Sequence, residues 1–333
     1  MRKKLAIVIL TWNDYKNTVK CLKSIINQLG NDKKIFLVDN NSSKIIFDKT
    51  IEWIKKNYNQ KFCNKVFKRI GKISNLNLST KSIFVIKNKK NLGCGFGHNT
   101  GYKLAIKNGF EFIARIDNDM IVPSNFFKHI LKNFSNKKIE AISPKVLYTS
   151  NPKMIWWMGA KIGNSLKFDR HMRDYPHGLK DNKRYSGLVE TDAIAGCASI
   201  MRSSRLIKIG LSDKDFFYGP EDVEFSKRIF TIEGSLIVDR NIKIYHSVTQ
   251  SFVNLNKRKI YYEYKYRLLL IKKIGSFMDK FVGYTWSFVK SLLYVIFSFK
   301  KKHRYKLGPV FLAWRDFILN RFGEYDRKTK TPF

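Results

Sequence analysis

Two aspartates one residue apart follow an apolar run near the middle of the sequence. Phe112–Ile116 has the composition of a buried strand, and Asp117-Asn118-Asp119 comes directly after it. Carboxylates at the end of a buried strand need solvent or a partner, and two at alternate positions can reach one hard divalent cation. Mg²⁺ or Mn²⁺ binds such oxygens together with those of a phosphate. The segment therefore predicts a metal and phosphate site, with a polar turn after an edge strand as the alternative.

Three other polar segments each follow an apolar run of the same kind. They are Thr11–Asp14 after Leu5–Leu10, Asp39–Ser43 after Ile35–Val38, and Asn91–Gly101 after Ile83–Ile86. Helical patterns alternate with these runs, which is typical of a mostly parallel sheet covered on both faces. Ligands in such sheets bind beyond the carboxyl ends of the strands. We therefore expect four loops to converge on one rim.

The connecting segments complete this coarse prediction. Asn13 or Asp14 can cap a helix that ends near Leu29, and residues 44 to about 81 contain a helical patch followed by a mobile insertion. After the glycine-rich loop, a helix is expected to end at about Asn108. Further elements are expected in the second half, namely a helix over Ser124–Phe134, strands over Ile155–Gly159, Ala193–Met201, Leu236–Val238 and Ile242–Tyr245, and a helix from Pro220 to about Phe230.

The composition restricts the class of protein. The chain has 333 residues, of which 44% are apolar, so it can build a full core. The formal net charge of +38 implies contact with polyanions, namely nucleic acid, anionic lipid or phosphorylated substrates. The four cysteines are far apart and form no Cys-x-x-Cys pair, which argues against a disulfide framework or a zinc site and favours a reducing compartment. The apolar run after Met1–Lys4 is too short for a signal peptide.

Seven segments in a fixed order together resemble glycosyltransferase family 2, whose members have the GT-A fold. They are Val8–Asn13, Leu37–Ser43, Asn91–Gly101, Asp117–Asp119, Gly196–Arg202, Phe217–Phe225 and Tyr245-His246. The resemblance covers residues 4 to about 250 and includes the rhamnosyl- and galactofuranosyltransferase-like members that build surface glycans. It implies an α/β fold with a mostly parallel central sheet flanked by helices. It also implies a nucleotide-sugar donor whose diphosphate leaving group is neutralised by Mn²⁺ or Mg²⁺.

The resemblance assigns roles to residues of the expected rim. Asp119 would ligate the metal, Asp117 would ligate it or hold the ribose, and His246 would be a further metal or diphosphate ligand. The nucleotide-sugar pocket would be bordered by the residues of the first three loops, namely Thr11, Trp12, Asn13, Asp39, Asn91, Gly93 and Asn99. Gly95 and Gly97 would let the backbone approach a ligand or would form a tight turn.

The same resemblance implies an inverting displacement, which needs one carboxylate to accept the proton of the acceptor hydroxyl. We expect Asp222 to be this general base, with Glu221 as the main alternative and Glu224 as a lesser one. The structural alternative is that these acids only neutralise the partial positive charge of a helix N-terminus. Trp156, Trp157, Gly196 and Cys197 are the expected acceptor-binding residues. Adjacent tryptophans on a strand point to opposite faces, so at most one can contact an acceptor sugar.

The C-terminal segment from residue 257 differs in composition from the rest of the chain. Lys265-Tyr266 replaces the Arg-Asn pair that relatives often carry, which puts an acceptor-phosphate role in doubt. Phe281–Phe299 is apolar with Lys290 as its single charge, and small and polar residues form one stripe of the helix. This pattern, with the basic run Lys300–Arg304, predicts a helix in the interface of an anionic membrane. Packing on the catalytic domain and a true membrane span are the alternatives.

These observations predict a catalytic domain over residues 1–256, with a nucleotide-binding half (1–122) and an acceptor half (123–256), followed by a membrane-associating region (257–333). The expected enzyme moves a sugar from a UDP- or dTDP-linked donor to a glycan or lipid-linked saccharide. We expect the enzyme at the inner face of the cell membrane and expect no nucleic acid as a partner. The sequence does not specify an oligomeric state. The alternatives are a sugar nucleotidyltransferase, which would need a basic phosphate loop after the first strand, and a basic nucleic-acid-binding protein.

Overall fold

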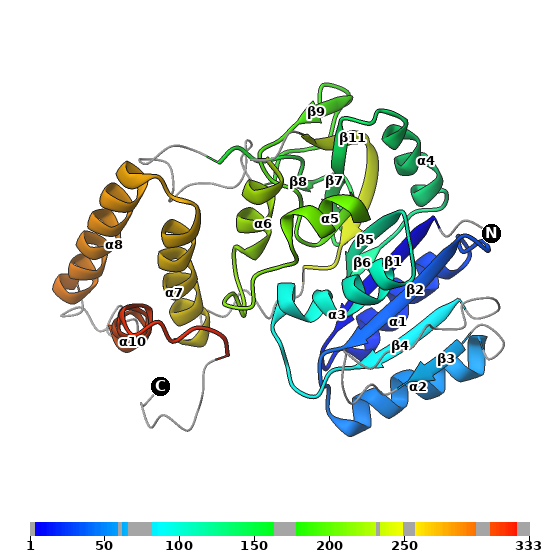
Figure 1. Cartoon of the computed structure of the whole chain (residues 1–333), viewed down its shortest axis with the longest axis horizontal. Helices are drawn as coiled ribbons and strands as arrows, with labels where there is room; N and C mark the ends of the chain where they lie inside the picture. Colours follow the sequence, from blue (N-terminus) through cyan, green and yellow to red (C-terminus); the bar gives the residue numbers. More distant parts are fainter. Residues whose placement is uncertain are drawn as a thin grey trace.

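Four parallel strands form the first half of the sheet. The structure, a computed structural model, describes residues 4–58, 62–65, 82–162, 178–230, 234–248, 257–297 and 307–324. The strands lie in the spatial order β4 (Ile83–Lys87), β2 (Lys33–Asp39), β1 (Leu5–Thr11), β5 (Phe112–Asp117), and β3 (Phe62–Lys65) extends the β4 edge (Figure 1). All four predicted strands are confirmed. The mobile insertion predicted after the helix lies mostly outside the described residues.

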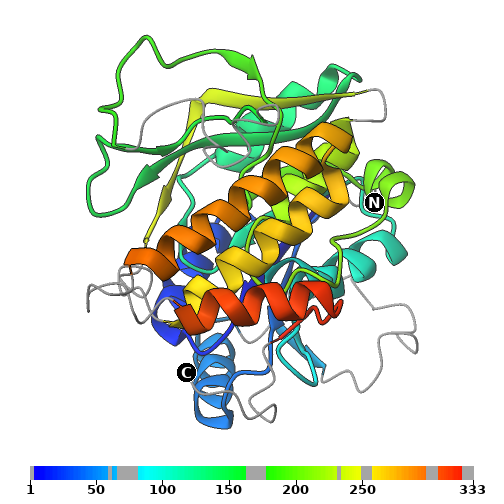
Figure 2. The same cartoon turned by 90° about the vertical axis from the view of Figure 1, so that its left-hand side faces the viewer.

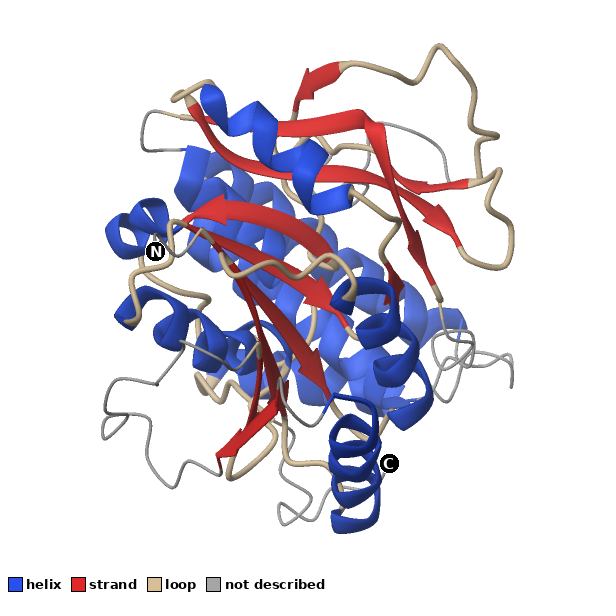
Figure 3. Ribbon diagram, turned by 90° about the vertical axis from the view of Figure 1, so that its right-hand side faces the viewer, coloured by secondary structure: helices blue, strands red, loops and turns tan. Residues whose placement is uncertain are grey.

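Helices cover both faces of this half, which explains why its strands are apolar throughout (Figure 3). On one face, Ile7 and Ile9 of β1 join a core with α1 (Tyr15–Ile26) and α2 (Lys44–Tyr58). On the other face, Val8 joins a core with α3 (Cys94–Lys107). The helix α1 begins where predicted, because the Asp14 carboxylate accepts a hydrogen bond of 3.1 Å from the backbone N–H of Asn17.

The helix α3 begins earlier than the glycine pattern predicts. Residues 94–101 are helical, and their glycines face neighbouring elements at close range. A Cβ on Gly97 would lie 2.9 Å from Leu10, and one on Gly101 would lie 2.4 Å from Val8. Gly95 and Gly97 therefore do not form a tight turn, and their lack of a side chain lets α3 approach the rest of the fold closely.

The second half of the sheet is mixed. Next to β5 lies antiparallel β10 (Ala198–Arg202), followed by β7 (Ile139–Tyr148), β11 (Ser235–His246) and β6 (Met120–Ile121). Short strands β8 (Ile155–Trp157) and β9 (Leu188–Glu190) pair with β7 and β11. Helices α4 (Phe126–Lys132), α5 (Ser203–Ile209) and α6 (Glu221–Phe230) and a 3-10 turn (Asn133–Ser135) complete this half.

Two predicted strand boundaries were wrong. The two short strands expected between Leu236 and Tyr245 are one strand with an irregularity between Asp239 and Lys243. Only the second half of the strand expected over Ala193–Met201 is a strand. In the first half, backbone N–H groups bind side chains and not a neighbouring strand. Ile194 N–H donates to Ser226 Oγ at 3.0 Å, and Ala195 N–H donates to Ser143 Oγ at 2.9 Å.

The described part of the C-terminal unit contains three helices, α7 (Lys257–Ile274), α8 (Phe277–Phe297) and α10 (Leu307–Ile318) (Figure 2). Lys265 of α7 is 1% exposed, and its ammonium group donates to the Tyr261 hydroxyl at 2.8 Å and to the carbonyls of Arg321 and Gly323. Lys265 thus holds the end of α10 against α7. Within the described residues, no helix is long and apolar enough to cross a bilayer.

Candidate active site

The strand β6 brings the second aspartate of Asp117-Asn118-Asp119 to the predicted histidine. In the antiparallel pairing of β6 with β11, Met120 lies opposite His246. The Asp119 Oδ2 atom is therefore 3.1 Å from His246 Nε2, and Ser247 N–H donates to the Asp119 carbonyl at 2.9 Å. Residues 127 positions apart in the sequence thus meet through one short strand pair.

The Asp119–His246 pair has spare ligand atoms. Among the described residues, the second carboxylate oxygen of Asp119 and Nδ1 of His246 are buried and have no hydrogen-bond partner. A buried polar atom without a partner is costly unless a ligand satisfies it. Carboxylate oxygens with one imidazole nitrogen suit Mn²⁺ well, and the oxygens suit Mg²⁺. The Asp119 carboxylate and His246 Nε2, which lie together, therefore offer two ligands that fit a divalent cation.

Asp117 lies beside this pair at the end of β5. Burial raises the pKa of its carboxyl to about 7, Arg115 opposes this shift, and the charge of Asp119 adds to it. The side chain is still 27% exposed, and its Oδ1 atom is 3.5 Å from Nε2 of the buried His98. The negative charges of the two neighbouring carboxylates repel each other, and a bound cation would relieve this repulsion.

Arg115 is an important residue of the site that the sequence reasoning missed. It is a single charge inside the apolar run of β5, and its guanidinium lies 2.9 Å from Glu221 Oε1 and 3.1 Å from Cys94 Sγ. Both members of the Arg115–Glu221 pair are nearly fully buried. An arginine in a predicted buried strand requires a buried acid from another part of the chain as its partner. This requirement is the feature of the sequence that could have identified Arg115.

A second group of possible ligands, Cys94, His98 and Asp117, also lies close together. Arg115 is in contact with this group, and its positive charge disfavours a second cation there. Burial lowers the pKa of His98 well below its usual value, and the charge of Arg115 lowers it further. The charge of Arg115 therefore makes this group a less suitable cation site than the Asp119–His246 pair.

Asp222 lies on the other side of the segment that contains Gly196 and Cys197. The backbone N–H of Asp117 donates to the Cys197 carbonyl at 2.9 Å. A Cβ on the neighbouring Gly196 would lie 2.6 Å from Asp222 Oδ2, so only glycine leaves room for this carboxylate. Burial raises the pKa of Asp222 to about 6, and the charge of Glu221 adds to the shift. The backbone of Asp117 and the carboxylate of Asp222 thus lie against one shared segment.

The first loops form a network of hydrogen bonds. Thr11 and Asp39 are buried, Trp12 is 52% exposed, and Asn13 has a left-handed backbone (φ 52°) that lets its carboxamide accept from Ser43 N–H. Asn40, a residue outside the predicted site, links the loops, because its amide donates to Asn91 Oδ1 at 2.7 Å and to the Gly93 carbonyl at 3.0 Å. Burial raises the pKa of Asp39. The predicted nucleotide residues, apart from Asn99, therefore lie in connected loops at the carboxyl ends of β1, β2 and β4.

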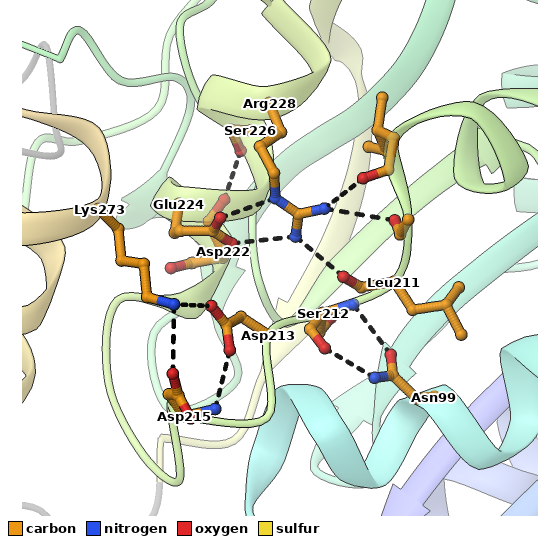
Figure 4. A network of polar contacts seen from close by, with 12 residues as sticks. Asn99, Leu211, Ser212, Asp213, Asp215, Asp222, Glu224, Ser226, Arg228 and Lys273 are labelled. Carbon is orange, nitrogen blue, oxygen red and sulfur yellow. Dashed lines mark hydrogen bonds and ion pairs between the residues drawn. The ribbon is translucent and has the colours of Figure 1, made fainter. Parts of the chain in front are cut away.

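Asn99 has a different surrounding from the one predicted. Its side chain forms two hydrogen bonds with the backbone of Ser212, of 2.8 and 3.0 Å, which use both polar atoms of the amide (Figure 4). Arg228 of α6 binds Glu224 and the carbonyls of residues 209 and 211, and Lys273 of α7 pairs with Asp213 at 2.8 Å. Asn99 thus positions the loop that leads to Asp222.

The two adjacent tryptophans differ in burial, although both contact the main core. Trp157 is 7% exposed and belongs to the main core. Trp156 is half-buried and packs edge-on against the His246 ring, with centroids 4.6 Å apart. Trp156 is therefore the one that borders the candidate metal pair.

Structural comparison shows which fold this arrangement belongs to. The crystal structure of GalNAc-T7 with UDP, GalNAc and Mn²⁺ superposes with a TM-score of 0.55 over 95% of this chain, at 14% identity. This chain spans 57% of the GalNAc-T7 chain. The mannosyltransferase PcManGT from Pyrobaculum calidifontis in complex with GDP-Man and Mn²⁺ gives 0.54 over 96% of this chain and 88% of its own, at 10% identity. Residues 1–349 of S. aureus TarS give 0.51 over 96% and 78%, at 15% identity. The fold is therefore GT-A, as predicted.

Sequence comparison adds the family. A search for sequence relatives among curated proteins finds no match. Residues 6–206 match Glycosyl transferase family 2, and this region holds Asp117, Asp119 and the Gly196-Cys197 segment. Because the match covers more than half of the sequence, the chain belongs to glycosyltransferase family 2.

Proposed function

We propose that this protein is an inverting, metal-dependent glycosyltransferase that acts on a UDP- or dTDP-linked sugar. The protein is a rhamnosyl- or galactofuranosyltransferase-like enzyme, and its acceptor is a glycan or lipid-linked saccharide in surface polysaccharide synthesis. The single observation that carries the proposal is the position of Asp222. Its carboxylate lies against Gly196, while the next residue accepts a hydrogen bond from Asp117. An acid on the acceptor side thus lies beside the acids on the donor side.

The donor side uses Asp117, Asp119 and His246. These residues would hold Mn²⁺ or Mg²⁺, which supplies positive charge to the diphosphate as it leaves. Thr11, Asn13, Asp39, Asn91 and Gly93 would border the nucleotide, since their loops follow the strands of the parallel half. Two of the structures with this fold are complexes with a nucleotide or nucleotide sugar and Mn²⁺, which supports the assignment.

The acceptor side depends on which acid of α6 can accept a proton. Glu221 is paired with Arg115 at 2.9 Å and Glu224 with Arg228 at 2.7 Å, so both carboxylates have cationic partners. Asp222 makes no salt bridge within the described part of the chain, and its raised pKa makes it a better base at neutral pH. Asp222 accepts the acceptor hydroxyl proton while the new C–O bond forms, and the donor C–O bond breaks to release the nucleotide diphosphate.

The test combines binding and turnover. Wild-type protein should be stabilised in thermal unfolding by a matching nucleotide sugar only when Mn²⁺ or Mg²⁺ is present. Asp119→Ala should lose this stabilisation, whereas Asp222→Asn should keep it and lose transfer by at least about a hundredfold. Asp32→Asn, which removes a half-buried ion pair with Lys33, is the control and should change neither. Metal-independent stabilisation of Asp119→Ala would refute the metal site, and an active Asp222→Asn would refute the base.

We also propose that the protein works at the inner face of the cell membrane as a peripheral or monotopic protein. The basic composition and the apolar C-terminal region support this location. A lipid-linked acceptor would then be present in the same membrane. Fractionation of cells should place the protein with membranes from which high salt and detergent together release it.

A further inference from the structure

The helix α8 has its polar side turned toward the protein. Gly283 and Ser287 are buried, and a Cβ on Gly283 would lie 3.0 Å from Ile271 of α7. The Ser291 hydroxyl accepts a hydrogen bond of 3.0 Å from the indole N–H of Trp314 in α10. The small and polar stripe thus packs against α7 and α10, where its hydroxyls also bond to the helix's own carbonyls.

The opposite side of α8 is apolar and exposed. Phe281, Trp286, Phe288, Leu292 and Ile296 are between 45% and 63% exposed, and Phe311 adds to this surface from α10 with 71%. A helix on a water-soluble surface normally shows the reverse arrangement, with its apolar stripe against the core. We call this surface the α8 face. Its large exposed apolar side chains indicate a surface that contacts a membrane or another molecule.

We propose that the α8 face docks on an anionic lipid bilayer and holds the acceptor side of the enzyme at the membrane surface. The charges support a bilayer as the occupant. Lys280 and Lys290 are half-buried at the two borders of the α8 face, and Lys300–Lys302 and Arg304 follow α8 in the sequence. Lysines beside an apolar, aromatic surface are typical of helices that lie in the interface of anionic membranes.

A second copy of the chain is a less suitable occupant. The formal net charge is +38, so two copies repel each other, whereas an anionic surface attracts the protein. The only acid of α8, Asp279, accepts hydrogen bonds from Ser276 at the start of the helix. The α8 face therefore offers no carboxylate to pair with the lysines of another copy.

The C-terminal unit is firmly connected to the acceptor side. Tyr266 of α7 packs on Phe216 with ring centroids 5.7 Å apart, and Tyr262 stacks on Phe217 at 5.5 Å. Val223, next to Asp222, belongs to the same apolar cluster. In Figure 1, α7 lies between α8 and α6. A bilayer bound to α8 would thus be on the side of the molecule where α7 packs against Val223 of α6. This orientation rests on the proposed glycosyl transfer, whereas the docking itself does not.

The experiment measures vesicle binding of the full chain by flotation. The double variant Phe281→Asp/Leu292→Asp introduces two charges at exposed positions. The matched control, Ile45→Asp/Ile207→Asp, does the same at apolar residues that are 78% and 65% exposed on α2 and α5. We expect wild type and control to float with vesicles of mixed phosphatidylglycerol and phosphatidylcholine. The α8 variant should bind them at least about tenfold more weakly. Thermal unfolding of all three proteins should agree.

Three outcomes would overturn the docking proposal. They are undiminished flotation of the α8 variant, equal loss in the control, or a concentration-dependent dimer of wild type that the α8 variant abolishes. Asp222→Asn should float like wild type, so a failure of the proposed catalysis does not affect this readout. On a lipid-linked acceptor in vesicles, the α8 variant should lose transfer while it keeps metal-dependent donor binding. Unchanged transfer there would refute the orientation.

Discussion

Three acids of one helical turn have three different surroundings. Glu221 is buried against Arg115, Glu224 is bound by Arg228, and Asp222 is buried beside Gly196 without a cationic partner at salt-bridge distance in the described structure. Their spacing in the sequence does not reveal this division, because the partners come from β5 and from the far end of α6. The difference in partners supports Asp222 as the proposed base and gives the other two carboxylates ion-pair partners.

The pH dependence of turnover should report Asp222. Its raised pKa of about 6 means that the carboxyl becomes protonated, and inactive as a base, as the pH falls through that value. We expect log kcat/KM to be level above about pH 7 and to fall about tenfold per pH unit well below pH 6. Glu221 raises this pKa and Arg115 lowers it. A pH–rate profile that stays flat to pH 4 would contradict the assignment.

Asp222→Asn should also make the fold more stable. The folded-state pKa lies above the usual carboxyl value, so the ionised side chain destabilises the protein once the pH exceeds that of the unfolded chain. This cost is absent below about pH 4, increases up to about pH 6 and is full above it. The neutral amide removes it, so we expect a gain of about 1–3 kcal/mol near pH 8 and little near pH 4. Denaturant unfolding at both pH values measures the difference.

Glu221→Gln separates a structural acid from a catalytic one. Removing one member of a buried ion pair leaves Arg115 without its partner, and we expect a loss of about 2–4 kcal/mol of stability. Glu263→Gln, in the exposed pair with Lys259, is the control and should cost under about 0.5 kcal/mol. At a temperature where Glu221→Gln is folded, the variant should retain turnover. Its loss of activity at acidic pH should occur at a lower pH than in wild type, because the charge of Glu221 no longer raises the pKa of Asp222. Loss of turnover by the folded variant would favour Glu221 as the base.

At the scale of elements, the order of strands and helices followed from the sequence in the parallel half. Apolar runs closed by polar residues marked β1, β2, β4 and β5, because strands buried on both faces leave a strong signal. The start of α3 did not follow, because glycine favours loops in isolation. Only the positions of Leu10, Val8 and Glu221 show why glycines occur within this helix.

Gly93 tests this contact between α3 and the acceptor side. It has φ 80°, and a Cβ would lie 2.2 Å from the Phe217 carbonyl oxygen. Gly109 has φ 72° with no atom within 4 Å of an added Cβ. Its substitution therefore measures the cost of the backbone conformation alone. We expect Gly109→Ala to cost about 1 kcal/mol. Gly93→Ala should cost at least about 3 kcal/mol, because the crowded atoms are backbone. Equal losses in denaturant unfolding would show that the contact is unimportant.

At the scale of the whole molecule, the C-terminal unit is part of the catalytic fold as well as a candidate anchor. The sequence identified the stripe of α8, but it did not reveal that this stripe contacts α7 and α10. A polar stripe is compatible with water, and only the partner residues Ile271 and Trp314 show its actual surroundings. Likewise, the position of Lys265 within a core could not be inferred from its type, since buried lysines are rare.

Deleting residues 257–333 should therefore impair more than membrane binding. Phe216 and Val223 would become exposed, and the ion pairs of Lys273 with Asp213 and Asp215 would be lost. We expect a loss of about 3–6 kcal/mol from the exposed apolar side chains. Transfer to a water-soluble acceptor should fall with it. A truncated protein with wild-type thermal unfolding and turnover would show that residues 257–333 are an independent attachment.

The antiparallel pairing of β5 with β10 has a practical consequence for the design of chimaeras. Ile113–Ile116 on the nucleotide side are hydrogen-bonded in register with Ala198–Met201 on the acceptor side. Grafted acceptor halves should therefore keep these eight positions and the glycine at 196, while residues 178–192 are varied. Such hybrids would inherit their sugar donor from one parent and their glycosidic linkage from the other.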